Sequence, residues 1–172
     1  MTALTRRRLM AVAAGSAPLI ALGNPAKALA AKGNVLLVHD DTLPAARRFA
    51  MRARLLGLPS QALEGDRVPL FRRWLAPRPA LVFGMTRHAD RLLLAEIARE
   101  MGYEDLAAIQ HRKGRDTLMQ GNRALASLSE TAGPCWPEAF AQWATGAGSK
   151  TVPPALHAQA EPGFSWVLRN KA

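Results

Sequence analysis

The chain alternates short apolar runs with longer stretches in which apolar residues recur every three or four positions. Val35–Val38 and Ala80–Phe83 are continuous apolar runs, which is the pattern of strands buried on both faces. Leu106–Gln110 is a further strand candidate, and Ser60–Leu63 is a shorter one. These four segments predict a sheet that is covered on both sides.

Between the runs, three stretches have the period of amphipathic helices. Their predicted ranges are 44–56, 68–75 and 86–101. Asp41 or Thr42 can cap the first of them, and Pro44 suits its first turn. Gly57 and Gly102 are placed to end the first and third helices, because glycine adopts the positive φ common at helix C-termini.

The order strand, helix, strand, helix, strand, helix, strand is typical of right-handed βαβ crossovers. We therefore predict one α/β domain over residues 31–172, with three layers and a mainly parallel sheet. Its general plan is that of flavodoxin-like or Rossmann-like βαβ units. If the strands lie in the order 2-1-3-4, the ends of the first, third and fourth are close together.

The second half is less regular. Segments 107–112 and 116–119 predict a hairpin, and 134–144 predicts a helix that carries three large aromatic residues. Residues 146–154 form a Gly- and Pro-rich connection. Segment 164–168 alternates enough to predict a last strand, antiparallel and at an edge of the sheet.

The first thirty residues have a different character, with the three-part layout of an export signal. A basic segment without acids precedes an apolar run from Leu9 to Gly23, and small residues follow at Ala28 and Ala30. The run is shorter than the about 20 residues that a membrane-spanning helix needs. We expect cleavage after Ala30, with Ala26-Lys27-Ala28 as the second candidate site.

The basic segment resembles a twin-arginine (Tat) signal. The matching residues are Thr5, Arg6, Arg7, Leu9 and Met10. The resemblance implies a bacterial cell, recognition by the Tat translocase, and export of an already folded chain to the periplasm. The alternative is an ordinary secretory signal that begins with three arginines. Cys135 is the single cysteine, so the fold has no intramolecular disulfide.

Removal of residues 1–30 changes the charge of the protein. Four of the 23 basic residues and none of the 13 acidic residues lie there, so a net charge of +10 becomes +6. The remaining arginines are spread out and do not alternate with aromatic residues, which disfavours nucleic-acid binding. The excess charge favours an anionic membrane surface or an acidic ligand. No segment of the mature chain is predicted to cross a membrane.

Candidate binding residues gather where the parallel strands end, since ligands of open α/β sheets bind outside that edge. The candidates are Asp40, Asp41, Thr42, Gly84, Thr86, Arg87, Asp90 and His111. Backbone N–H groups near Gly84 and the Thr86 hydroxyl can hold an anion, with Arg87 as the countercharge. The simpler interpretation is that Gly84 makes a turn and Thr86 caps the next helix.

Other chemistry has weaker support. His39, His88 and His111 can form a metal site only if they converge, and no local pair of histidines supports this. We therefore favour no metal, and the sequence names no cofactor. Cys135 precedes a helix, where a thiolate is favoured, but no histidine stands beside it in sequence. No Gly-x-Ser-x-Gly motif is present.

The sequence thus predicts a soluble periplasmic protein that is a non-catalytic binding or accessory module, with an anionic small molecule or an exported protein as partner. One alternative is a small periplasmic enzyme whose site lies at the C-terminal edge of the parallel strands. Another is an accessory subunit of an exported redox complex, which rests on the resemblance to Tat signals alone.

Overall fold

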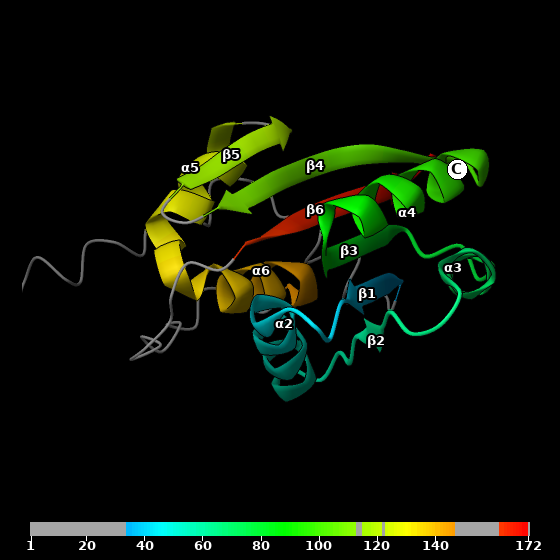
Figure 1. Cartoon of the computed structure of the whole chain (residues 1–172), viewed down its shortest axis with the longest axis horizontal. Coiled ribbons are helices and arrows are strands. Elements are labelled where there is room, and N and C mark those ends of the chain that lie inside the picture. Colours follow the sequence, from blue (N-terminus) through cyan, green and yellow to red (C-terminus); the bar gives the residue numbers. More distant parts are fainter. Residues whose placement is uncertain (1–33, 113–114, 122, 147–161, 172) are drawn as a thin grey trace, which may run out of the picture.

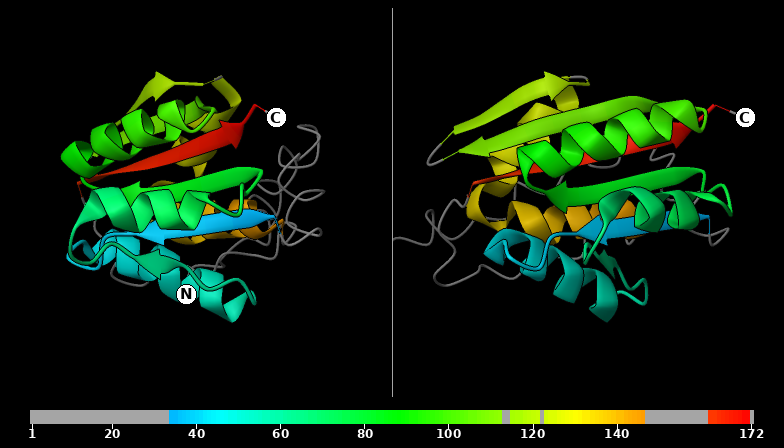
Figure 2. Two further views of the ribbon diagram at one scale, coloured as in Figure 1. Left: turned by 90° about the vertical axis from the view of Figure 1, so that its right-hand side faces the viewer. Right: turned by 45° about the vertical axis from the view of Figure 1, so that its right-hand side comes forward.

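The computed structural model of the chain describes residues 34–112, 115–121, 123–146 and 162–171. The predicted signal segment and most of the predicted Gly- and Pro-rich connection lie outside these residues. Helices cover both faces of one sheet, as Figures 1 and 2 show. The predicted three-layer α/β arrangement is therefore confirmed.

Within the described residues, the sheet has six strands in the order β2-β1-β3-β6-β4-β5. Their bounds are Val35–His39 (β1), Gln61–Ala62 (β2), Leu81–Thr86 (β3), Tyr103–Arg112 (β4), Arg115–Gln120 (β5) and Gly163–Asn170 (β6). β1 pairs in parallel with β2 and β3, whereas β3–β6, β6–β4 and β4–β5 are antiparallel. The sheet is mixed, and the prediction of a mainly parallel sheet is wrong.

The last strand explains this difference. β6 is antiparallel, as predicted, but it lies between β3 and β4 rather than at an edge (Figure 1). Phe164–Leu168 are five consecutive buried residues, which is the pattern of a strand covered on both faces. The predicted neighbours β3 and β4 are consequently separated by one strand. The predicted hairpin of β4 and β5 is present.

One face of the sheet carries α2 (Pro44–Leu55) and α6 (Trp136–Thr145). Phe49 of α2 packs against Phe140 of α6, and both belong to one buried cluster with Phe83 and Val167 of the sheet. The Ala-rich side of α2 permits this close approach.

The other face carries α3 (Arg67–Leu75) and α4 (His88–Glu100), which pack on Val82, Ala108 and Trp166. A further helix, α5 (Arg123–Ala132), lies beside β5 and leads through a 3₁₀ turn into α6. The sequence did not predict α5.

Local signals set most helix ends. The Asp66 side chain accepts a hydrogen bond from the Val68 N–H and caps α3. Gly57 and Gly102 follow α2 and α4 with φ of +85° and +87°, as predicted. The N-cap of α2 is Leu43, so the predicted cap by Asp41 or Thr42 is wrong.

In the part of the chain that the structure describes, no helix combines the length and the apolar character that crossing a bilayer requires.

Candidate functional site

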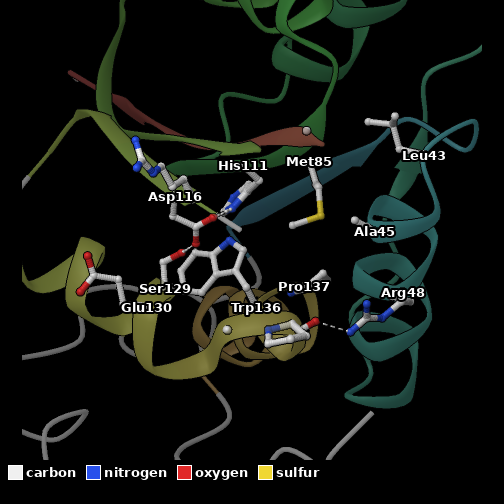
Figure 3. Close-up of a pocket in the computed structure, with 14 residues that line it drawn as sticks. Leu43, Ala45, Arg48, Met85, His111, Asp116, Ser129, Glu130, Trp136 and Pro137 are labelled. Atoms are coloured by element: carbon white, nitrogen blue, oxygen red, sulfur yellow. Dashed lines mark hydrogen bonds and ion pairs between the residues drawn. The ribbon is translucent and has the colours of Figure 1, made fainter. Parts of the chain in front are cut away.

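A pocket of about 370 Å³ opens on the face of the sheet that carries α2 and α6. It lies at the edge where β4 ends and β6 begins, between α2 and the segment that joins α5 to α6 (Figure 3). Its walls are mostly apolar, and the apolar members include Leu43, Ala45, Met85, Pro134, Trp136 and Pro137. Its polar members are Arg48, His111, Arg115, Asp116, Ser129 and Glu130.

His111, at the end of β4, is the centre of a partly buried hydrogen-bond network. Its Nδ1 lies 2.9 Å from Asp116 Oδ1, and its Nε2 lies 2.8 Å from the Ser165 hydroxyl. The Trp136 indole Nε1–H donates to the same hydroxyl at 3.0 Å, and the Ser129 hydroxyl donates to Asp116 Oδ2. Residues from β4, β5, β6, α5 and α6 thus meet at the wall of the pocket.

The chemistry of the donors fixes the direction of one of these bonds, and the protonation of His111 sets the others. An indole N–H is only a donor, so the Ser165 oxygen accepts from Trp136. When His111 is neutral and protonated on Nδ1, it donates to the Asp116 carboxylate and its Nε2 accepts from the Ser165 hydroxyl; when His111 is an imidazolium, both ring nitrogens donate. With a neutral imidazole, every hydrogen-bonding group of this network has a partner.

Asp116 is held as a carboxylate. Burial alone raises its pKa, but the hydrogen bonds from His111 and Ser129 and the charge of His111 outweigh burial, so its pKa lies below the ordinary value. The side chain retains 22% exposure toward the pocket. The pocket therefore has a fixed anionic group beside an aromatic wall.

Arg48 and Glu138 form a second polar group at the pocket. The Glu138 carboxylate accepts from Nε and from one terminal nitrogen of Arg48, at 2.7 and 2.8 Å, and the Pro134 carbonyl accepts from the same terminal nitrogen. This bidentate pair joins α2 to the start of α6, and Figure 3 shows Arg48 at that side of the pocket.

The predicted residues of the β1 end do come together, but they bind one another. The Asp40 carboxylate is buried and accepts from the Thr42 N–H and hydroxyl at 2.9 and 2.6 Å. Arg87 Nε lies 3.1 Å from the second Asp40 oxygen, an ion pair without hydrogen-bond geometry, and the same guanidinium donates to Thr42. Because Asp40 already neutralises Arg87, this cluster is a poor anion site.

Gly84 and Thr86 lie inside β3, so their predicted roles in a turn or a helix cap are wrong. A Cβ on Gly84 would lie 2.0 Å from the Trp166 ring, so the glycine makes room for that indole. The fully buried Thr86 hydroxyl accepts from Trp166 Nε1 at 3.0 Å. Both residues therefore seat Trp166, and neither is available to an anion.

Asp90 lies in the first turn of α4, as predicted, where its carboxylate pairs with Arg67 Nε at 3.3 Å. Asp41 is more than half exposed and bonds to His39 Nε2 at 2.8 Å. These two candidates are thus engaged in separate ion pairs and do not face the pocket.

The three histidines do not converge. His39 bonds to Asp41 and to the Ser60 hydroxyl, and His88 stacks on Phe164 at 4.5 Å between ring centroids. His111 belongs to the network described above. Among the described residues, no group of three potential metal ligands is close enough to hold an ion. Cys135 lies half-buried at the start of α6.

Of the predicted candidates, only His111 lines the pocket. Sequence reasoning missed Asp116, Ser129, Trp136 and Ser165. Asp116 follows the predicted hairpin turn, which places it beside His111 on the paired strand, and that pairing was the available signal. No sequence signal identified Ser129 or Ser165, because their positions beside His111 and Asp116 depend on α5 and on the central place of β6 in the sheet.

Comparisons of the chain with protein-family models, with curated proteins and with solved structures find no match.

Proposed function

We propose that this protein is exported through the Tat pathway and binds a small molecule in the periplasm, in the pocket between α2 and α6. The observation that carries the binding function is the pocket itself, an apolar cavity with a preformed His111–Asp116 pair in its wall. The N-terminal sequence, with Arg6 and Arg7, supports export.

The dimensions and lining of the pocket are those of a small-molecule site. Such sites enclose about 300–1,000 Å³ and combine apolar walls with a few fixed polar groups. The cavity of about 370 Å³ suits a compact ligand with a planar apolar body that lies against Trp136 and Met85. A hydrogen-bonding group of that ligand would meet Asp116.

A pair of matched substitutions tests this function. Ala45 and Ala95 are each 8% exposed and lie on helices of opposite faces, but Ala45 lines this pocket and Ala95 does not. A thermal-shift screen with small aromatic acids, amines, phenols and esters should find compounds that stabilise the wild type and Ala95→Leu. Ala45→Leu, which fills part of the pocket, should lose that stabilisation.

Export requires a separate experiment. Replacement of Arg6 and Arg7 by lysine should leave the precursor in the cytoplasm, because paired arginines define a Tat signal. Cell fractionation with an epitope tag at the C-terminus measures this. Unchanged export of the double variant would overturn the assignment to the Tat pathway without touching the binding function.

A further inference from the structure

We propose that Ser165 is a nucleophile for acyl transfer, with His111 as its general base, and that the ligand of the pocket is a carboxylic ester. This inference rests on the pocket being the ligand site and adds a reaction to it. The relay of serine hydroxyl, imidazole and carboxylate is recognised by geometry and not by sequence order. Here its two hydrogen bonds are 2.8 and 2.9 Å.

In the neutral form of His111, the direction of the bonds is the one that activates a serine. Trp136 donates to the Ser165 oxygen, and when His111 is neutral with its proton on Nδ1, the Ser165 hydroxyl donates to His111 Nε2. Asp116 receives Nδ1–H and stabilises the imidazolium that forms when His111 takes the proton.

The Ser165 hydroxyl is buried directly behind the side chains that form the pocket wall. Ser165 is 2% exposed and does not line the cavity, but four of its immediate neighbours do. His111 and Trp136 bond to its oxygen, Met85 pairs with it across the sheet, and Gly163 precedes it by two residues on β6. Access of an acyl group requires the Trp136 indole to move aside, which frees its N–H for the carbonyl oxygen of the ester.

The reaction balances with water as the second reactant. The Ser165 oxygen bonds to the acyl carbon, its proton passes to His111 Nε2, and the ester C–O bond breaks as that proton is given to the leaving alcohol. Water then attacks the acyl carbon while His111 accepts its proton. The acid is released and the proton returns to the Ser165 oxygen.

The chain contains its own control. Ser60, His39 and Asp41 form a second grouping of the same three residue types, with bonds of 2.9 and 2.8 Å. There the serine bonds to Nδ1, the carboxylate is more than half exposed, and none of the three lines the pocket. We therefore expect no nucleophilic reactivity at Ser60.

Labelling of the mature wild-type chain with a fluorophosphonate, followed by peptide mass spectrometry, tests the proposal. The expected result is one adduct at Ser165 that persists in Ser60→Ala and is absent in Ser165→Ala. His111→Asn should slow the labelling about 100-fold or more, the usual contribution of a general base. The same variant should lose hydrolysis of 4-nitrophenyl butyrate by a similar factor.

Absence of an adduct at Ser165 in the folded wild type, or equal labelling of Ser60, would overturn the proposal. This test remains valid even if Ser165→Ala fails to fold, because the residue that carries the adduct in the wild type is identified directly by peptide mass spectrometry. If Ala45→Leu still abolishes ligand stabilisation and no adduct forms, the pocket binds a ligand without acyl transfer. If no compound of the thermal-shift screen stabilises the wild type and no adduct forms, the proposed function fails as well.

Discussion

At the scale of single residues, Gly84 shows how the absence of a side chain at one position makes room for a large one at another. Any Cβ at this position would lie 2.0 Å from the Trp166 ring, which is fully buried and cannot retreat. Gly84→Ala should therefore lower the free energy of unfolding by about 3 kcal/mol, as measured by urea denaturation.

Gly163 is the matched control, since a Cβ there comes no closer than 3.8 Å to another atom and its φ is not positive. Gly163→Ala should unfold at nearly the wild-type urea concentration. Equal stability of the two variants would contradict the packing described for Trp166.

Asp116 makes a pH-dependent contribution to stability. Its pKa is lowered in the folded chain relative to an ordinary value of about 3.9. The carboxylate therefore stabilises the fold above that value, and the contribution is lost as the pH falls through the folded pKa. Asp116→Asn should be less stable than the wild type at pH 6, and the difference should shrink below pH 3.

Denaturant unfolding across this pH range measures the effect. Glu64→Gln, which changes an exposed carboxylate far from the network, serves as the control and should follow the wild-type curve. A constant difference between Asp116→Asn and the wild type at all pH values would contradict the account.

Sequence reasoning at this scale found which polar residues lie at the end of the parallel strands but not what they bind. Asp40, Thr42 and Arg87 do meet, yet they satisfy one another. The Thr86 hydroxyl accepts a hydrogen bond from the indole of Trp166, which lies 80 residues later in the chain. Such partners depend on which strand lies next to β3, and local patterns do not carry that information.

At the scale of elements, the position of β6 distinguishes this fold from the predicted one. Val167 lies in the middle of β6, is 1% exposed, and pairs with Phe83 on one side and Ala107 on the other. Val167→Asp buries an unpaired charge in the core and should cost about 3 kcal/mol or more.

Met119 of β5 provides the comparison, since β5 is the edge strand and this side chain is 56% exposed. Met119→Asp should express and unfold like the wild type. Circular dichroism during heating measures both variants. Tolerance of aspartate at residue 167 would mean that β6 is not an internal strand.

The existence and type of most elements were predictable, because 35–38 and 80–83 are continuous apolar runs and the helix after each has a strong helical period. The order of strands was not. Segment 164–168 contains one serine among apolar residues, which suggested alternation, whereas all five side chains are buried. The Ser165 hydroxyl is accommodated in the core only because Trp136 and His111 bond to it.

At the scale of the whole molecule, insertion of β6 creates the pocket. It brings Gly163 beside His111 in the sheet and leaves β4 free to extend into a hairpin that presents Asp116. The joint between α5 and α6 then closes the cavity with Trp136. The central claim is that this cavity is the ligand site.

Two buried indoles allow a direct test of that claim. The Nε1–H groups of Trp136 and Trp166 each donate to a buried hydroxyl at 3.0 Å, but only Trp136 lines the pocket. In ¹H–¹⁵N spectra with assigned indole signals, addition of the small-molecule fraction of a cell extract should shift the Trp136 signal and leave the Trp166 signal in place. An unshifted Trp136 signal, or equal shifts at both indoles, would contradict the claim.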